Sequence, residues 1–317
     1  MSILVTGGTG FLGAYLVRHL VEVVGARDVV LFDRAPAPDK LGRCADRVRI
    51  VTGDILDRAA LAGVIGEFGV DRIAHLAYTL STGLDADPPA GIRINCEGTV
   101  NVFEAARQAG VRRVVFGSSV TMYGMRTELV GAEVDEDTEP HPDSLYGMCK
   151  QFDERIAGWY GARHGLEIIA MRPISIFGLG RGQRATSAQS ARHFMVLPEI
   201  AALGEPVTMP PDEQVIDWMY AADAAHAFHL ALTVPAPAHR IFNMASDRVR
   251  TGEVTAILRR LLPGVQIRSG TEPVPCHFLV SQRRLREELG YAPRFSLEQA
   301  LAEYIADARA ARRAMPA

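Results

Sequence analysis

The sequence predicts an α/β fold, with a doubly wound parallel sheet and a smaller carboxyl-terminal lobe. Strand-like apolar runs alternate with helical periods through the first half of the chain. Several of these runs, such as residues 29–32, are continuously apolar, as in strands that are covered on both faces. This alternation indicates a parallel sheet. After Pro173 the alternation gives way to glycine-rich and polar segments, which predict the lobe.

The expected elements follow in chain order. The predicted strands are "SILVT", "DVVLFD", "RVRIVTGD", "RIAHLA", "RRVVFGSS", "LEIIAMRP" and "RIFNMA". The predicted helices cover 11–24, 61–68, 92–109 and 146–164, and a terminal helix has Ser296 as its N-cap. Residues 177–190 and 207–214 are predicted to be loops that shape a substrate pocket. We assign 1–172 and 214–247 to the sheet domain, and 173–213 and 248–317 to the lobe.

Composition narrows the functional class. The chain has 317 residues and a net charge of -3, which gives no reason to expect nucleic acid or an anionic membrane as a partner. No apolar run approaches a membrane span or a signal-peptide core, so a cytoplasmic protein is expected. The four cysteines are scattered and form no CxxC pair, so neither a metal site nor a disulfide framework is predicted. They are Cys44, Cys96, Cys149 and Cys276.

A glycine cluster lies where the first strand must turn into the first helix, in "TGGTGFLG". Gly7 allows the tight turn, Gly10 lets a pyrophosphate approach the main chain, and Gly13 lets the helix lie against the sheet. The helix that starts at Phe11 and Leu12 directs its free amide groups and its positive dipole end at phosphate. This spacing is a variant of the dinucleotide fingerprint, so the sheet is predicted to be of the Rossmann type.

The second strand ends in an acid. A carboxylate at Asp33 can accept both ribose hydroxyls of an adenosine and would repel a 2′-phosphate, which favours NAD over NADP. The neighbouring Arg34 weakens that preference, because a guanidinium can pair with phosphate. The alternative for Asp33 is a plain turn or helix cap.

Two residues of "LYGMCK" suggest acid/base chemistry. Tyr146 and Lys150 are four positions apart, so their side chains share one helical face. An ammonium group about 4 Å from a phenol would favour the phenolate and lower the tyrosine pKa from about 10 towards neutrality. The alternative is an ordinary solvated helix pair.

The strand "RRVVFGSS" supplies a partner for this pair. It ends with Gly117, Ser118 and Ser119 at the carboxyl edge of the sheet, where ligands of open α/β sheets bind. A hydroxyl there can hydrogen-bond a substrate oxygen while Tyr146 exchanges its proton. Together with the glycine cluster, this order of motifs favours catalysis over the structural alternatives.

At this point the chain resembles the extended short-chain dehydrogenases/reductases, the NAD-dependent epimerase/dehydratase family. The resemblance covers nearly the whole chain and depends on "TGGTGFLG", "GDILD", "HLAY", "NCEGTVNV", "SSVTMYG", "YGMCK", "MRPISIFG", "DWMYAADAA" and "ELGYAP". It implies that Tyr146 is the acid/base, that Lys150 holds the nicotinamide ribose, and that Ser119 orients the substrate. It also implies a homodimer formed through a four-helix bundle of the helices 92–109 and 146–164.

The same resemblance implies further contacts. Asp54 and Ile55 would flank the adenine, Leu76 and Ala77 would line the cofactor cleft, and Asn95 would steady the catalytic region. Further cofactor and substrate contacts are implied at Gly117, Thr121, Pro173, Ser175 and Arg268. His75 is expected to be a satisfied core histidine.

Departures from the family pattern bear on the substrate. Nucleotide-sugar epimerases usually carry an asparagine where this chain has Ser175, and an arginine where it has Ile216. A substrate diphosphate would lose charge-assisted hydrogen bonds there, although Arg268 can supply one. Family dehydratases place an Asp-Glu pair where this chain has Val120 and Thr121, so dehydration is not expected.

Three functions stay open. The favoured one is an NAD-dependent oxidoreductase that acts at a secondary alcohol or ketone of a small polyhydroxylated or hydroxy-acid substrate. The first alternative is a sugar epimerase, with or without a nucleotide-linked substrate, that recycles tightly bound NAD. The remote alternative is a non-catalytic dinucleotide sensor on the same fold.

Overall fold

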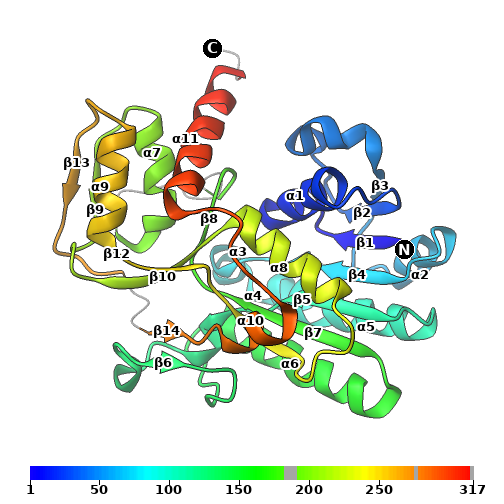
Figure 1. Ribbon diagram of the computed structural model, residues 1–317. Helices are drawn as coiled ribbons and strands as arrows, with labels where there is room; N and C mark the ends of the chain where they lie inside the picture. Colours follow the sequence, from blue (N-terminus) through cyan, green and yellow to red (C-terminus); the bar gives the residue numbers. More distant parts are fainter. Residues whose placement is uncertain (182–190, 275–277, 315–317) are drawn as a thin grey trace.

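The computed structural model describes residues 1–181, 191–274 and 278–314, and its largest element is a seven-stranded parallel sheet (Figure 1). The strand order is β11-β7-β5-β4-β1-β2-β3. These strands are β1 (Ile3–Thr6), β2 (Val29–Asp33), β3 (Arg49–Thr52), β4 (Arg72–His75), β5 (Arg113–Gly117), β7 (Glu167–Pro173) and β11 (Ile241–Met244). Every pairing in this sheet is parallel, which confirms the predicted fold class.

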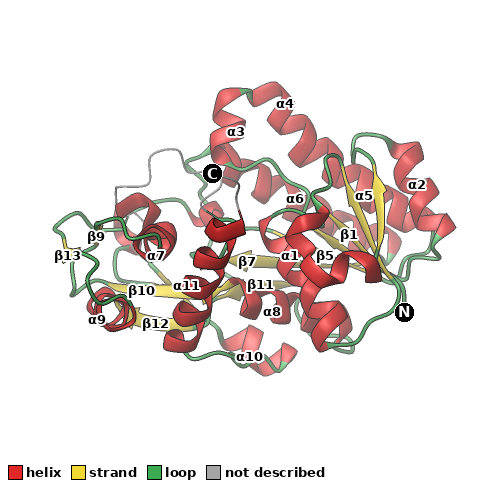
Figure 2. Cartoon of the chain, turned by 90° about the horizontal axis from the view of Figure 1, so that it is seen from above, coloured by secondary structure: helices red, strands yellow, loops and turns green. Residues whose placement is uncertain are grey.

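Helices cover both faces of the main sheet (Figure 2). On one face lie α1 (Phe11–Arg18) and α8 (Ala221–Thr233), and their apolar side chains join one core cluster. On the other face lie α2 (Arg58–Glu67), α5 (Gly98–Gln108) and α6 (Leu145–His164), which contribute to a second cluster. The continuous run at 29–32 is buried throughout because its side chains point alternately into these two clusters.

Two predicted helices contain a π-helical segment. The helix expected at 11–24 is α1 followed by η1 (His19–Val23), where the helix widens to the π form. The helix expected at 92–109 is α4 (Pro88–Ile92), the π-helical η3 (Arg93–Glu97) and then α5. A π segment adds a residue to the turn and thereby redirects the side chains that follow. Apolar periodicity does not reveal it.

Smaller sheets and helices make up the rest of the structure. The strands are β8 (Ile176–Phe177), β10 (Val215–Tyr220) and β12 (Asp247–Arg250) in one sheet, β9 (Val207–Met209) with β13 (Ile267–Ser269), and β6 (Glu133–Val134) with β14 (Leu279–Val280). The helices are α3 (Ser81–Ala86), α7 (Leu197–Ala202), α9 (Thr251–Leu261), α10 (Arg283–Leu289) and α11 (Leu297–Ala314). Short 3-10 turns are η2 (Pro38–Arg47), η4 (Val120–Tyr123), η5 (Thr127–Leu129) and η7 (Ala191–Val196).

The structure corrects the loop prediction for residues 207–214 and confirms Ser296 as an N-cap. Residues 207–214 begin with β9 rather than being a loop throughout, because Val207 pairs with Ile267 across the small sheet. Residues 182–190 of the other expected loop lie outside the described residues. Ser296 does cap α11, since its Oγ accepts a hydrogen bond from the amide of Gln299 at 3.3 Å. The assignment of chain segments to two domains stays a prediction.

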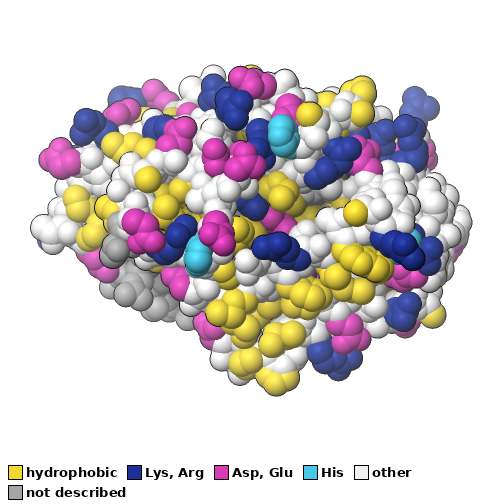
Figure 3. All heavy atoms as spheres, turned by 90° about the horizontal axis from the view of Figure 1, so that it is seen from below, with side chains coloured by type: hydrophobic (Ala, Val, Ile, Leu, Met, Phe, Trp, Pro, Cys, Tyr) yellow, Lys and Arg dark blue, Asp and Glu magenta, His cyan; other side chains and the backbone are white. Residues whose placement is uncertain are grey.

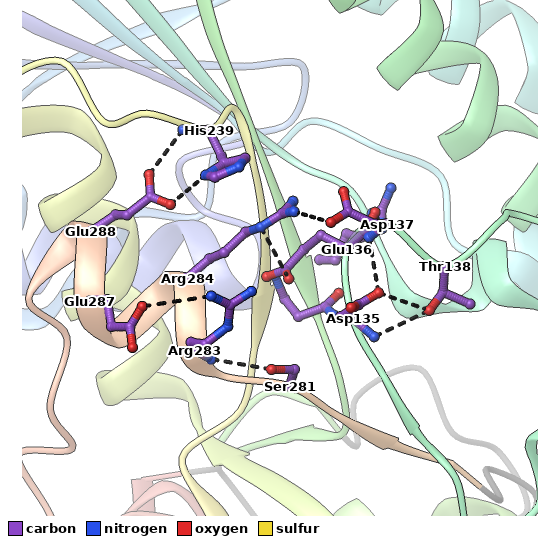
Figure 4. Close-up of polar contacts among 12 residues, drawn as sticks. Asp135, Glu136, Asp137, Thr138, His239, Ser281, Arg283, Arg284, Glu287 and Glu288 are labelled. Atoms are coloured by element: carbon purple, nitrogen blue, oxygen red, sulfur yellow. Dashed lines mark hydrogen bonds and ion pairs between the residues drawn. The ribbon is translucent and has the colours of Figure 1, made fainter.

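Helix α10 is tied to the segment after β6 by charged side chains (Figure 4). Arg284 pairs with Asp137 and lies 3.8 Å from a carboxylate oxygen of Glu136. On the same helix, Glu288 accepts hydrogen bonds from the backbone amide and the ring of His239. Three segments that are distant in sequence are therefore held together by these contacts. No helix among the described residues is long and apolar enough to span a bilayer.

Candidate active site

The glycine turn forms the floor of the candidate site. Gly7 has φ +66°, a left-handed conformation that glycine adopts without strain, and its carbonyl accepts a hydrogen bond from the amide of Gly10 at 2.9 Å. A Cβ on Gly13 would lie 2.1 Å from that same carbonyl oxygen, so a larger residue there would push α1 off the turn. Gly7 also lies directly against the backbone of Leu76 and Ala77, which brings the ends of β1 and β4 together.

The residues at this turn fit the diphosphate of a dinucleotide. Gly10 is the N-cap of α1, and no side chain caps the helix. The amides of the first turn, which begins at Phe11 and Leu12, are thus left to bind an anion, and the helix dipole favours negative charge there. The structure therefore places the predicted phosphate-binding residues in one turn.

Asp33 stabilises the glycine turn. Its Oδ2 accepts hydrogen bonds from the amide and the hydroxyl of Thr9, at 3.1 and 2.7 Å, and Oδ1 accepts from the amide of Ala35. Arg34 is exposed, and its guanidinium lies 4.0 Å from the carboxylate of Asp54. The capping role that was weighed against ribose binding is therefore present, and it leaves Asp33 with lone pairs for a ligand.

Asn95 is fully buried and fixes the loop after β4. Its side-chain oxygen accepts from the amide of Thr79, and its side-chain nitrogen donates to the carbonyl of Thr79, both at 2.8 Å. His75 is buried between the hydroxyls of Thr6 and Thr99, and burial lowers its pKa to about 3. The expectation of a satisfied core histidine at position 75 is confirmed.

Helix α6 presents the tyrosine and the lysine at one end of the sheet. Ser144 caps the helix by accepting from the amide of Gly147, which places Tyr146 in the first turn and Lys150 one turn later. The ammonium of Lys150 donates to the carbonyl of Gly117 at 2.7 Å and lies 5.4 Å from the centroid of the Tyr146 ring. The end of β5 and the start of α6 are thereby joined.

The electrostatics around Tyr146 differ from the sequence prediction. Burial raises the pKa of Tyr146, and the cation that opposes this rise is Arg181 rather than Lys150. Lys150 lies over the ring of Tyr78 and 3.8 Å from the carboxylate of Asp153, and burial lowers its own pKa to about 7. The expected lowering of the tyrosine pKa by Lys150 is therefore absent, because Lys150 points to Gly117 and Asp153.

Ser119 is oriented for a further hydrogen bond. Its Oγ accepts from the amide and the hydroxyl of Thr121, at 3.2 and 2.9 Å, so its own hydrogen can go to a ligand. Ser118 is different, because its hydroxyl donates to Glu154 at 2.5 Å. Of the two adjacent serines, the one predicted to contact substrate is the one whose donor remains available.

The remaining predicted substrate residues lie in two separate hollows. Ser175 follows Pro173 at the end of β7, has φ +42°, and lines a small hollow with Ile216 and Asp217. Arg268 on β13 lines a different cavity of about 290 Å³ between α7, β9 and β13, where it donates to Gln266. The two hollows share no lining residue, so the structure does not bring Arg268 together with Ser175.

Three side chains at the site were missed in the sequence prediction. Tyr78 and Asp153 are buried against Lys150, and Arg181 lies close enough to Tyr146 to affect its pKa. Asp153 follows Lys150 by three positions, so helical spacing was the available signal. Tyr78 and Arg181 come from loops after β4 and β8, where spacing gives no comparable signal.

Comparison with known proteins gives the family. Residues 3–245 match the profile of the NAD dependent epimerase/dehydratase family. A UDP-glucose 4-epimerase from Streptomyces lividans is 28% identical over 306 residues, which cover 92% of this chain and 91% of that protein.

Two dehydrogenases are also similar. A D-erythronate dehydrogenase from Cupriavidus necator is 35% identical over 173 residues, 51% of each chain. The solved holo structure of an L-threonine dehydrogenase from Cupriavidus necator has a TM-score of 0.81 and 25% identity, with 97% of this chain and 99% of that one covered.

Proposed function

Because the chain belongs to the NAD-dependent epimerase/dehydratase family, whose members are enzymes, we propose that it is a dehydrogenase. Its substrate would be a small polyhydroxylated or hydroxy acid, oxidised at a secondary alcohol. The similarity to a D-erythronate dehydrogenase and to an L-threonine dehydrogenase supports this substrate class, since both names denote small hydroxylated acids.

The observation that carries the proposal is the charge around the hollow beside Ser175. The described residues that line it are mostly apolar and include the carboxylate of Asp217 but no cation. The nearest arginine of that sheet, Arg248, is engaged by Asp217 and Glu133. A diphosphate would meet no charge-assisted donor there, which disfavours a nucleotide-sugar substrate.

Arg181, near Tyr146, is a cation that could bind the carboxylate of a substrate. The guanidinium of Arg181 is near Tyr146, and burial lowers its pKa. Within the described ranges, no carboxylate forms an ion pair with it. A partly buried cation without an anionic partner is costly, so a substrate carboxylate would relieve that cost and orient the hydroxyl.

The proposed roles follow from the geometry. NAD, held at the glycine turn with Asp33 at its ribose, supplies the hydride acceptor when it is bound. Tyr146 would take the proton of the substrate hydroxyl, and Ser119 would donate a hydrogen bond to the same oxygen. The ammonium of Lys150, anchored on the carbonyl of Gly117, would hold the cofactor ribose.

The test is a substrate comparison with purified full-length protein. We expect NADH to accumulate with NAD and four-carbon aldonates or L-threonine, and Tyr146→Phe to lower kcat/KM by about 10²–10⁴-fold. Arg181→Gln should raise KM for acidic substrates, whereas the exposed Arg283→Gln serves as the control. Interconversion of UDP-glucose and UDP-galactose without net NADH would instead establish the epimerase alternative, which the Streptomyces lividans relative supports.

Cofactor preference can be tested separately. We propose NAD rather than NADP because a carboxylate at Asp33, at the end of β2, would accept the ribose hydroxyls and repel a 2′-phosphate, although Arg34 is exposed beside it. Asp33→Ser should reduce the ratio of kcat/KM for NAD to that for NADP. Equal use of both cofactors by the unaltered protein would contradict the preference.

We also propose a homodimer. Large apolar side chains are exposed on α4 and α6, namely Ile92, Met148, Phe152 and Trp159. Figure 3, which views the molecule from below, shows hydrophobic side chains gathered on that side. A second copy that pairs these helices would cover them. Light scattering should give twice the chain mass, and Phe152→Glu should give the single mass.

A further inference from the structure

Three histidines gather on the face of the main sheet opposite to α6. Nitrogen atoms of His19, His226 and His229 all lie within 4.8 Å of one another. Nε2 of His19 is 3.3 Å from Nδ1 of His229, and the rings of His19 and His226 are 5.4 Å apart. None of the three belongs to the candidate active site at the glycine turn and Tyr146.

Local structure explains how these side chains meet. His226 and His229 are three positions apart on α8, so they share one helical face. His19 is the first residue of the π segment η1, which interrupts the regular spacing of α1. Helices α1 and α8 pack side by side, and single-turn π segments are frequent at functional sites.

From this arrangement we propose that the three histidines form a binding site for a zinc ion. Imidazole nitrogens bound to one zinc at about 2.0–2.1 Å are about 3.4 Å apart in a tetrahedral site, so a shift of about an ångström would close the cluster. Water would complete the coordination. The ion would join helix α1 to α8, on the sheet face away from Tyr146.

One nitrogen of the cluster lacks a hydrogen-bond partner among the described residues. Nδ1 of His226 is buried and has no hydrogen-bond partner in the described part of the chain. An unsatisfied buried acceptor is costly, and a metal would satisfy it.

Arg294 is the group that opposes binding. Its guanidinium lies 3.3 Å from Nδ1 of His19. If zinc binds Nε2 of His19, the ring hydrogen of His19 must be on Nδ1. That N–H donor would then face the N–H donors of Arg294, which is unfavourable. Because Arg294 is exposed, it can turn into solvent.

The experiment uses tag-free, full-length protein that has been treated with a chelator. Titration calorimetry with zinc chloride should show one site per chain, and cobalt(II) should give the visible bands of an imidazole-bound ion. His226→Gln and His229→Gln should each weaken zinc binding at least about 10-fold. The exposed His141→Gln is the matched control and should leave it unchanged.

Arg294→Gln provides a gain-of-binding test. It removes the competing charge and offers an oxygen that can accept from Nδ1 of His19, so zinc affinity should rise. The proposal is wrong if the wild-type protein and the His226→Gln/His229→Gln double variant bind zinc equally. It is also wrong if no zinc binds. These readouts do not depend on the substrate.

Discussion

Two neighbouring carboxylates on α6 have opposite surroundings. Glu154 receives both nitrogen arms of Arg172, at 2.8 and 2.6 Å, and the hydroxyl of Ser118. Asp153 is fully buried 3.8 Å from Lys150, and neither of its oxygens has a hydrogen bond within the described residues. The first pair is satisfied by the fold. The second pair, the incomplete one, lacks hydrogen bonds to the carboxylate among the described residues.

The largest expected effect comes from removing the cation of the incomplete pair. Lys150→Met should lower kcat/KM by about 10²-fold, because the ammonium proposed to hold the cofactor ribose is lost and NAD is no longer held in place at Tyr146. The free energy of unfolding should not fall, since burial already disfavours the ammonium and raises the pKa of Asp153. NADH formation and urea unfolding measure the two quantities. Activity above a tenth of wild type would contradict the assignment.

Removing the cation of the satisfied pair should act on stability instead. Arg172→Met would leave Glu154 buried and uncompensated, at a cost of about 3–5 kcal/mol in the free energy of unfolding. Replacing Glu154 by leucine in the same chain should recover part of this loss, because no unpaired charge remains. A loss below about 1 kcal/mol in the single variant would show that the pair is not needed for the fold.

The incomplete pair should also produce a pH dependence. In the unfolded chain a lysine holds its proton to about pH 10.4, whereas the lowered pKa of Lys150 means that the folded chain loses it near pH 7. Between these values the lysine makes the unfolded state bind more protons and so makes the free energy of unfolding rise with pH, whereas the raised pKa of Asp153 acts in the opposite direction, because the folded state keeps a proton that the unfolded state has lost. The slope is at most about 1.4 kcal/mol per pH unit. In urea unfolding without nucleotide, the free energy of unfolding of wild type minus that of Lys150→Met should therefore increase as the pH rises above 7.

The smallest expected effects come from removing one buried hydroxyl from each of two tyrosines, Tyr123 and Tyr78. The hydroxyl of Tyr123 bonds to Asp135 and Asn243 and receives a hydrogen bond from Arg172, so Tyr123→Phe should cost about 1–3 kcal/mol. The buried hydroxyl of Tyr78 has no hydrogen-bond partner in the described segments, so Tyr78→Phe should change stability by less than about 0.5 kcal/mol. If thermal unfolding shows the same loss of stability for both variants, the proposed difference between the two hydroxyls is wrong.

The sequence predicted those features that depend on local spacing. Gly7, Gly10 and Gly13 have a fixed geometric use at a strand-to-helix turn, and Tyr146 and Lys150 are fixed by the helical repeat. The continuous apolar runs predicted the parallel sheet, because strands that are buried on both faces are apolar at every position.

Features that depend on long-range packing were not predicted. The direction of Lys150 is decided by Gly117 and Asp153, and a helical repeat does not encode that choice. The histidine cluster joins positions more than 200 residues apart in the sequence. Motifs of closely spaced metal ligands therefore do not reveal it. The assigned roles of the cofactor and substrate residues stay predictions.

The position of β11 at the edge of the main sheet has a consequence during synthesis. This strand pairs Ile241 to Met244 with the end of β7, yet β8, β9 and β10 are all translated before it. A chain emerging from the ribosome therefore carries the open hydrogen-bonding edge of β7 for a long interval. Nascent molecules that stall before residue 241 are the ones we expect chaperones to hold.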